Sequence, residues 1–190
     1  KCRTPAAGHR SHLRNTRTRS LTASLSIRFR LTSLLLTKNH IIMQTIDLTQ
    51  RPPRSPRVRL GGYALLPRLL DKCRAEINGK HGDYHYNCPL DQRFLDFVGV
   101  EAEALKTEVA NGLGDGEILS WITANASNKH SEWEIAQWSE FREAAAPSDN
   151  ESRDFVNELV AGAGGTARED LATWFEVLDL DDHVSFGGKA

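Results

Sequence analysis

Arginine side chains gather early in this chain, in a segment that proline keeps extended. Residues 47–60 contain Arg51, Arg54, Arg57 and Arg59 together with three prolines within five positions. Proline fixes φ and lacks the amide donor, so this segment is predicted to be an extended arm rather than a helix. Guanidinium groups bind carboxylate or phosphate through paired hydrogen bonds, and a stiff arm loses little entropy when it does so. The arm is therefore a candidate site for an anionic group.

More charged residues follow the Gly61-Gly62 turn, on a helix predicted over 67–78. The apolar residues of this helix form one stripe, so we expect its charged residues to project from the other side. They are Arg68, Asp71, Lys72 and Arg74. Together with the arm, they form an Arg-rich face that could hold an anionic ligand or partner.

Internal pairing is the competing interpretation of the same cations. Asp179, Asp181 and Asp182 are expected just past the last helix, where negative charge opposes the helix dipole and favours a cationic partner. Ion-pair networks resemble functional sites in their residue types. The sequence leaves both interpretations open.

A second group of residues that could take part in catalysis or binding lies in the stretch 79–91. This stretch is the least helical one after residue 42. Tyr84 and Tyr86 alternate with polar residues, which predicts a short strand or extended loop and possible pairing with 58–60. The stretch holds one cysteine and has no second ligand cluster of similar quality, so no metal site is predicted. A packed aromatic loop with solvent-facing histidines is the simpler structure.

Two functions from different classes follow from these residues. The favoured one is a small cytoplasmic binding or interaction domain that uses the Arg-rich face for an unknown anionic small molecule or protein. The alternative is a small enzyme acting on an anionic metabolite in a pocket between the 67–78 helix and the 83–91 loop. In the enzyme, Arg68 would hold the substrate and His85 or Asp91 would act as acid or base. The candidate ligand-binding residues are Arg54, Arg57, Arg68, Asp71, Lys72, Arg74, Tyr84, Tyr86, His85 and Asp91. No catalytic residue can be assigned, and neither a metal nor a cofactor is expected.

Charge divides the chain at Met43, its only methionine. Residues 1–42 carry nine Lys or Arg and no acid, whereas the remaining 148 residues have a formal charge of −10. The first part is interpreted as a non-native or disordered leader, with a truncated transit peptide and a nucleic-acid-binding arm as alternatives. The acidic body, 43–190, suits a single domain and argues against nucleic-acid binding. Its two cysteines favour a reducing cytosol, and the apolar run at 31–36 is too short to span a membrane.

The body is predicted to be mainly helical, with helices of about ten residues separated by Gly or Pro. Early helices are expected over 91–98, 101–111 and 116–126. Three later ones are predicted to begin at Ser/Thr-x-x-Glu capping boxes: Ser131/Glu134, Ser148/Glu151 and Thr166/Glu169. Short helices and short loops indicate a compact orthogonal all-α bundle with an extended N-terminal arm. Cys73 falls on an apolar stripe and is expected to be inert, whereas Trp133 lies off its stripe and is expected to be exposed.

Several short motifs resemble those of a known family. They are Arg54-Ser55-Pro56-Arg57, Leu60-Gly61-Gly62-Tyr63, Asp71-Lys72-Cys73-Arg74-Ala75, Tyr84-His85-Tyr86-Asn87-Cys88-Pro89-Leu90-Asp91, Asp179-Leu180-Asp181-Asp182 and Ser185-Phe186-Gly187-Gly188. The chain resembles a bacterial family catalogued only as domain of unknown function 5069, over about residues 45–190. The resemblance supports a native start at Met43, but it implies no activity.

Overall fold

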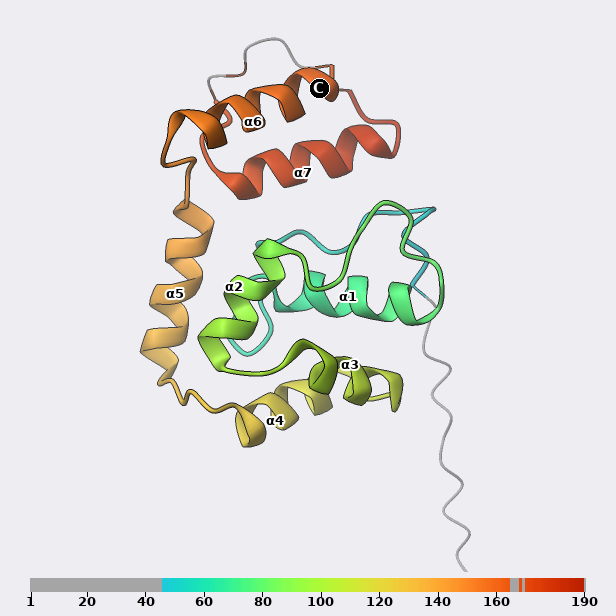
Figure 1. Cartoon of the computed structure of the whole chain (residues 1–190), viewed down its shortest axis with the longest axis vertical. Coiled ribbons are helices and arrows are strands. Elements are labelled where there is room, and N and C mark those ends of the chain that lie inside the picture. The colour runs from blue at the N-terminus through green and yellow to red at the C-terminus, as the bar shows by residue number, and fades with distance from the viewer. Residues whose placement is uncertain (1–45, 165–167, 169, 190) are drawn as a thin grey trace, which may run out of the picture. The chain divides into compact units, whose positions relative to one another are not determined.

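Seven α-helices make up the described part of the chain (Figure 1). The computed structural model describes residues 46–164, 168 and 170–189. The helices are α1 (Leu66–Ile77), α2 (Pro89–Val98), α3 (Ala102–Ala110), α4 (Asp115–Asn125), α5 (Glu132–Ala144), α6 (Asn150–Gly162) and α7 (Trp174–Ser185). No β-strand forms within these residues, which confirms the predicted all-α class. The predicted leader and the boundary at Met43 lie outside the described residues.

Helix α1 contributes the largest number of buried residues to the main apolar cluster. All residues from Leu66 to Ala75 are buried, so both the apolar and the charged side of the helix are covered. The main apolar cluster joins α1 to the three helices that follow it. Its members include Leu66, Leu69, Leu70 and Cys73 of α1, Phe94, Leu95 and Val98 of α2, Leu105 and Val109 of α3, and Ile118 and Ile122 of α4.

Helix α5 is attached to α2 and to the turn before α1. The ring of Trp138 stacks on Phe97 with centroids 4.8 Å apart and meets Phe94 edge to face. The buried Ser139 hydroxyl donates to the Gly62 carbonyl at 2.8 Å and accepts from the Ala64 amide at 3.0 Å. These bonds satisfy backbone groups that the turn leaves unpaired.

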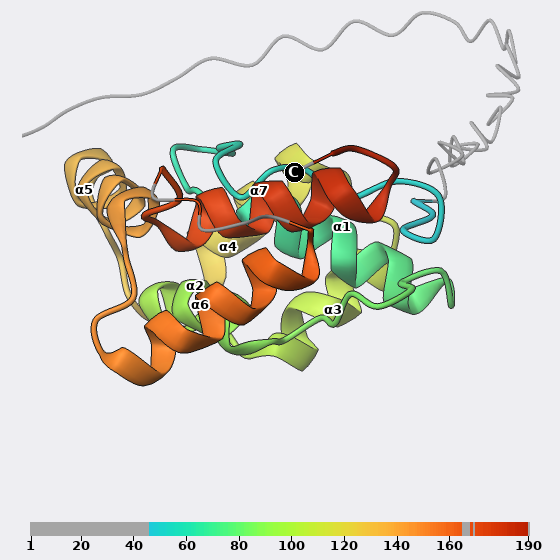
Figure 2. The same cartoon turned by 90° about the horizontal axis from the view of Figure 1, so that it is seen from above.

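Helices α6 and α7 lie side by side in both views (Figures 1 and 2). Val156 and Val160 of α6 pack against Val177 of α7 in a separate small cluster. In contrast, Phe155 of α6 and Phe141 of α5 are more than half exposed. Trp133 is 70% exposed, as predicted.

The turn at Gly61-Gly62 forms as predicted and needs glycine. Gly61 has φ of +59°, and a Cβ there would lie 2.6 Å from the side chain of Leu119. Leu60 and Tyr63, on either side of this turn, form an isolated antiparallel bridge. The predicted pairing of 58–60 with 84–86 is wrong, because the two tyrosines bond elsewhere: Tyr84 to Asp182 and Tyr86 to the Ala102 carbonyl.

The helix starts were only partly predicted. The capping box at Ser131/Glu134 is confirmed. At α6 the predicted Ser148/Glu151 box is wrong, because Asp149 is the N-cap and accepts from the Ser152 amide at 2.8 Å.

The last helix begins later than predicted. Thr166 and Glu169 lie outside the described residues, and α7 starts at Trp174 behind a capping box formed by Thr173 and Glu176. Asp179, Asp181 and Asp182, expected past the last helix, therefore lie within it. The motif Thr-x-x-Glu occurs at both places, so the pattern alone could not select the correct start.

Candidate functional site

The charged side of α1 is buried, which corrects the expectation that it projects freely. Every charged residue between positions 68 and 74 pairs with a different segment of the chain. The pairs are Arg68 Nη1 with Asp182 Oδ2 of α7 at 2.6 Å, Asp71 Oδ1 with Arg54 Nη2 of the arm at 2.7 Å, Lys72 Nζ with Asp91 Oδ1 of α2 at 2.8 Å, and Arg74 Nη1 with Asp115 Oδ1 of α4 at 2.6 Å. A helical wheel separates polar from apolar residues, but it cannot tell a solvated side from one covered by counter-charges.

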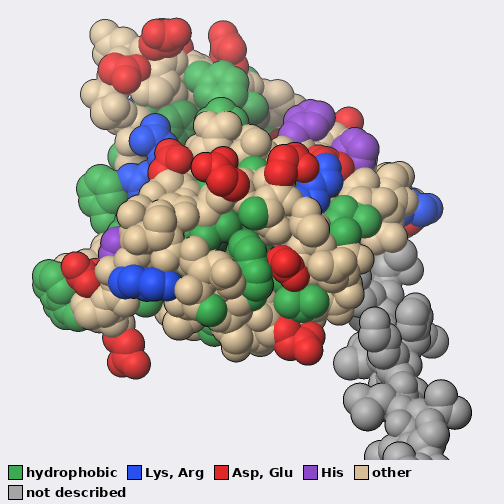
Figure 3. All heavy atoms as spheres, turned by 60° about the horizontal axis from the view of Figure 1, so that its bottom comes forward, with side chains coloured by type: hydrophobic (Ala, Val, Ile, Leu, Met, Phe, Trp, Pro, Cys, Tyr) green, Lys and Arg blue, Asp and Glu red, His purple; other side chains and the backbone are tan. Residues whose placement is uncertain are grey.

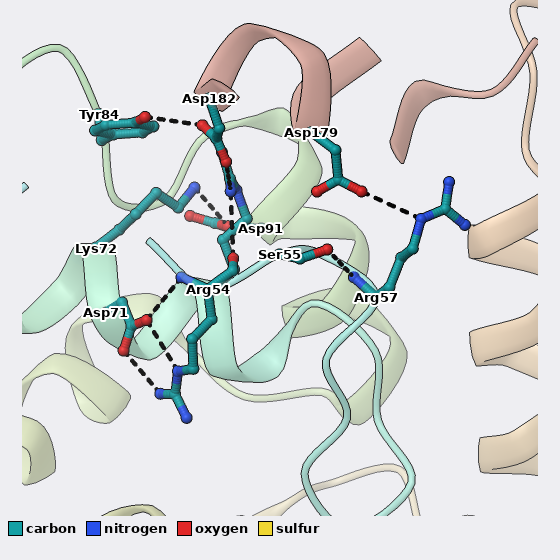
Figure 4. A network of polar contacts seen from close by, with 10 residues as sticks. Arg54, Ser55, Arg57, Asp71, Lys72, Tyr84, Asp91, Asp179 and Asp182 are labelled. Carbon is teal, nitrogen blue, oxygen red and sulfur yellow. Dashed lines mark hydrogen bonds and ion pairs between the residues drawn. The ribbon is translucent and has the colours of Figure 1, made fainter. Parts of the chain in front are cut away.

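Arg68 and Asp182 form a buried pair, with side chains 5% and 8% exposed. The guanidinium also reaches the second carboxylate oxygen from Nη2, and Tyr84 donates its hydroxyl to Asp182 Oδ1 at 2.8 Å (Figure 4). The pKa of Tyr84 is raised, mainly by burial and next by this hydrogen bond to a carboxylate. The arrangement joins α7, α1 and the 79–88 loop at one point.

Arg54 connects the arm to two helices. Its Nε and Nη2 bind both oxygens of Asp71, its amide donates to the same carboxylate at 2.9 Å, and its Nη1 meets Asp115 at 2.6 Å. Burial alone would lower the pKa of Arg54, but the hydrogen bonds to Asp71 and Asp115 outweigh it and raise that pKa. Figure 4 shows the paired bonds to Asp71.

The outer arginines of the arm make weaker, more exposed pairs. Arg57 Nε lies 3.2 Å from Asp179 Oδ2 of α7, and Arg59 Nη2 lies 2.8 Å from Glu143 Oε1 of α5. The pairs of Arg57 and Arg68 are those that the internal-pairing interpretation anticipated between the cations and the C-terminal acids. Exposed pairs of this kind contribute little to stability.

A hollow of about 330 Å³ opens where the arm, α1 and α4 meet. We call it the arm hollow; it is lined by Ile46, Arg51, Arg54, Asp71, Arg74, Gly114 and Asp115. Arg51 is exposed and makes no ion pair with the described residues. Arg74 is 8% exposed, and its Nε is buried without a hydrogen-bond partner. The hollow thus gathers three guanidinium groups and two carboxylates.

Asp115 stands between two of these guanidinium groups. Burial would raise the pKa of its carboxyl, but hydrogen bonds from Arg54 and Arg74 outweigh burial and lower it. The residue is also the first of α4, where the positive end of the helix dipole favours an anion. Asp115 thus compensates the charge of both arginines.

A second hollow, of about 470 Å³, lies between α1, the 79–88 loop and α7. We call it the loop hollow; of the predicted site residues, Arg68, Lys72, Tyr84 and His85 line it. Its other walls are Leu48, Thr49, Gly82, Asp83, Cys88, Leu90, Leu178, Asp181, Ser185 and Phe186. Tyr86 turns away to the Ala102 carbonyl, and Asp91 lies buried behind Lys72 without reaching the wall. The pKa of Asp181 is raised, mainly by burial and next by repulsion from Asp182.

Sequence reasoning missed Cys88 as a partner of Lys72. Lys72 Nζ donates to Cys88 Sγ at 3.2 Å and is itself held by Asp91 at 2.8 Å. Cys88 is the N-cap of α2, and the Pro89 that follows marks that helix start in the sequence. Nothing in the sequence places Lys72 beside it. Cys73, in contrast, is buried as predicted, and burial raises the pKa of its thiol to about 12.

Two broader properties concern the described residues as a set. None of their helices is long and apolar enough to cross a membrane. Across residues 46–164, 168 and 170–189 no group of three or more His, Cys, Asp and Glu side chains is placed to hold a metal ion.

Comparison with known proteins identifies the family but no activity. The family model described as "Domain of unknown function (DUF5069)" matches residues 50–184, so the chain belongs to this family. No curated protein matches the chain.

Proposed function

We propose that this protein is a binding domain for a small anionic ligand, carrying carboxylate or phosphate groups, at the arm hollow. The observation that carries the proposal is the imbalance of charge there. Arg51, Arg54 and Arg74 face two carboxylates, and the Nε of Arg74 has no acceptor. A buried donor without an acceptor costs free energy that a bound anion would recover.

The arrangement suits a multivalent anion better than a long polymer. Arg54 and Arg74 are already held in place by Asp115, so they lose little entropy on binding, whereas Arg51 is free to close over the ligand. On the face shown in Figure 3 the basic side chains are scattered among acidic ones and form no continuous basic surface. Free Cys73 and Cys88 support a reducing, cytoplasmic location.

Ligand binding can be tested by thermal shift and calorimetry with inorganic phosphate and with citrate. Sodium chloride of equal ionic strength serves as the control, because salt alone screens ion pairs. Either anion should raise the melting temperature above the chloride control, since a ligand that binds only the folded state stabilises it. Equal melting temperatures in all three salts would argue against the proposal.

Arg51→Ala separates binding from stability. Arg51 is exposed and unpaired among the described residues, so its loss should change the unfolding free energy by no more than about 0.5 kcal/mol. Affinity for the anion should fall about tenfold, as expected when one charge-assisted hydrogen bond is lost. Arg153→Ala, at an exposed arginine of α6, is the matched control and should bind normally. Equal affinities of the two variants would show that the arm hollow is not the binding site.

The enzyme alternative is supported by the concavity of the loop hollow. It gathers Arg68, Tyr84 and a carboxylate from the segments where the sequence suggested a substrate pocket. The proposed roles need revision, however. Asp182 occupies both terminal guanidinium nitrogens of Arg68, and Asp91 lies behind the wall, so His85 is the remaining acid or base of the original pair.

A further inference from the structure

We propose that Cys88 is a thiol modification site, at which small hydroperoxides oxidise its Sγ to a sulfenic acid. The proposal concerns the loop hollow and is independent of anion binding at the arm hollow. It begins from three side chains in a row: Cys88 Sγ, Lys72 Nζ at 3.2 Å and Asp91 Oδ1 at 2.8 Å from that nitrogen.

The row has the geometry of an activated nucleophile. A nucleophilic side chain within hydrogen-bond reach of a second group, which a third group orients, is the recurring arrangement of such sites. Lys72 is 5% exposed and Asp91 is 2% exposed, so the ammonium is fixed beneath the sulfur instead of moving in solvent. An ammonium that donates to sulfur stabilises the thiolate, which is the reactive form of cysteine.

Two further features act in the same direction. Cys88 is the N-cap of the ten-residue helix α2, where the dipole favours negative charge. The second oxygen of Asp91 is buried without a hydrogen-bond partner, so the buried carboxylate depends on Lys72 for charge compensation and keeps the ammonium beside the sulfur.

The hollow gives a reagent access to the sulfur. Cys88 is partly exposed and lines the wall together with apolar Leu90, Leu178 and Phe186. Such walls admit hydrogen peroxide and small organic hydroperoxides. Sγ attacks one peroxide oxygen, an S–O bond forms and the O–O bond breaks. Sulfur is oxidised by two electrons, and the leaving oxygen takes the thiol proton, which yields water or an alcohol.

The experiment exposes the full-length protein to hydrogen peroxide at pH 7, traps sulfenic acid with dimedone and quantifies each cysteine peptide by mass spectrometry. The reference is a synthetic peptide of residues 84–92, which contains Cys88 without Lys72. Cys88 in the protein should react at least about tenfold faster than in the peptide. The reason is that the free energy of a hydrogen bond to a charged group corresponds to a factor of about ten or more. Cys73 should remain unmodified. A rate for Cys88 equal to or below that of the peptide overturns the proposal.

Variants connect the rate to Lys72. Lys72→Met should slow oxidation of Cys88 about tenfold, whereas Lys106→Met, at a partly exposed lysine paired with Glu76 at 2.6 Å, should not. Because Lys72→Met leaves Asp91 buried alone, the double variant Lys72→Met/Asp91→Leu removes the pair together, a change that buried ion pairs often tolerate. A double variant that keeps the wild-type rate contradicts the role of Lys72.

Discussion

At the scale of single residues, Asp115 has the clearest electrostatic role. Its two oxygens meet Arg54 Nη1 and Arg74 Nη1, each at 2.6 Å, and its side chain is 29% exposed. Removing the charge leaves two guanidinium groups without their shared acceptor. The same residue limits the anion capacity that we propose for the arm hollow, because a ligand would have to bind beside this carboxylate or displace it.

Asp115→Asn should lower the unfolding free energy by about 1.5–3 kcal/mol at pH 7, the range for hydrogen bonds to charged groups. The folded-state pKa of Asp115 is lowered. Its stabilisation is therefore complete above the unfolded pKa of about 4 and is lost as pH falls through the folded pKa. Urea unfolding from pH 7 to pH 3 should show a constant difference from wild type down to about pH 4 and a shrinking one below. Asp96→Asn, at an exposed aspartate, should show no such difference at any pH.

At the scale of elements, the sequence predicted the helices well and their surroundings poorly. Apolar stripes and glycine stops located α1 to α4 to within two residues, because these signals are local. The burial of the charged side of α1 could not be predicted, since its partners come from the arm, α2, α4 and α7. Cys88 was overlooked for the same reason: its contact with Lys72 depends on how the 79–88 loop folds back on α1.

The start of α7 offers a test of capping at this scale. Thr173 accepts from the Glu176 amide, and Glu176 accepts from the Thr173 amide at 2.8 Å. Thr173→Ala should therefore cost about 1 kcal/mol of unfolding free energy, measured by urea denaturation. Ser148→Ala is the matched control, because Ser148 belongs to the box that does not form and Asp149 caps α6 instead. If the control were as destabilised as Thr173→Ala, the capping assignment at α6 would be wrong.

At the scale of the whole described unit, α7 is joined to α1 and the residues before it by an apolar contact and a buried ion pair. Phe175 packs with Ala64 and Leu65 at one end of α7, and the Arg68–Asp182 pair closes the other end. Buried pairs often add little net stability compared with apolar residues, but they penalise any arrangement that separates the charges. We therefore expect the pair to specify where α7 docks, and with it the shape of the loop hollow.

The last prediction concerns this docking. Arg68→Met leaves Asp182 buried with only the Tyr84 hydroxyl as a donor, so it should cost about 3–5 kcal/mol of unfolding free energy. Arg68→Met/Asp182→Leu removes both charges and should recover most of that loss, because an apolar pair of similar volume needs no counter-charge. Arg59→Met, whose partly exposed partner is Glu143, is the control and should cost less than about 1 kcal/mol. Urea denaturation gives the free energies, and hydrogen exchange should show α7 losing protection first in the single variant. If Arg68→Met were no more destabilising than Arg59→Met, the buried pair would not be what fixes α7 against α1.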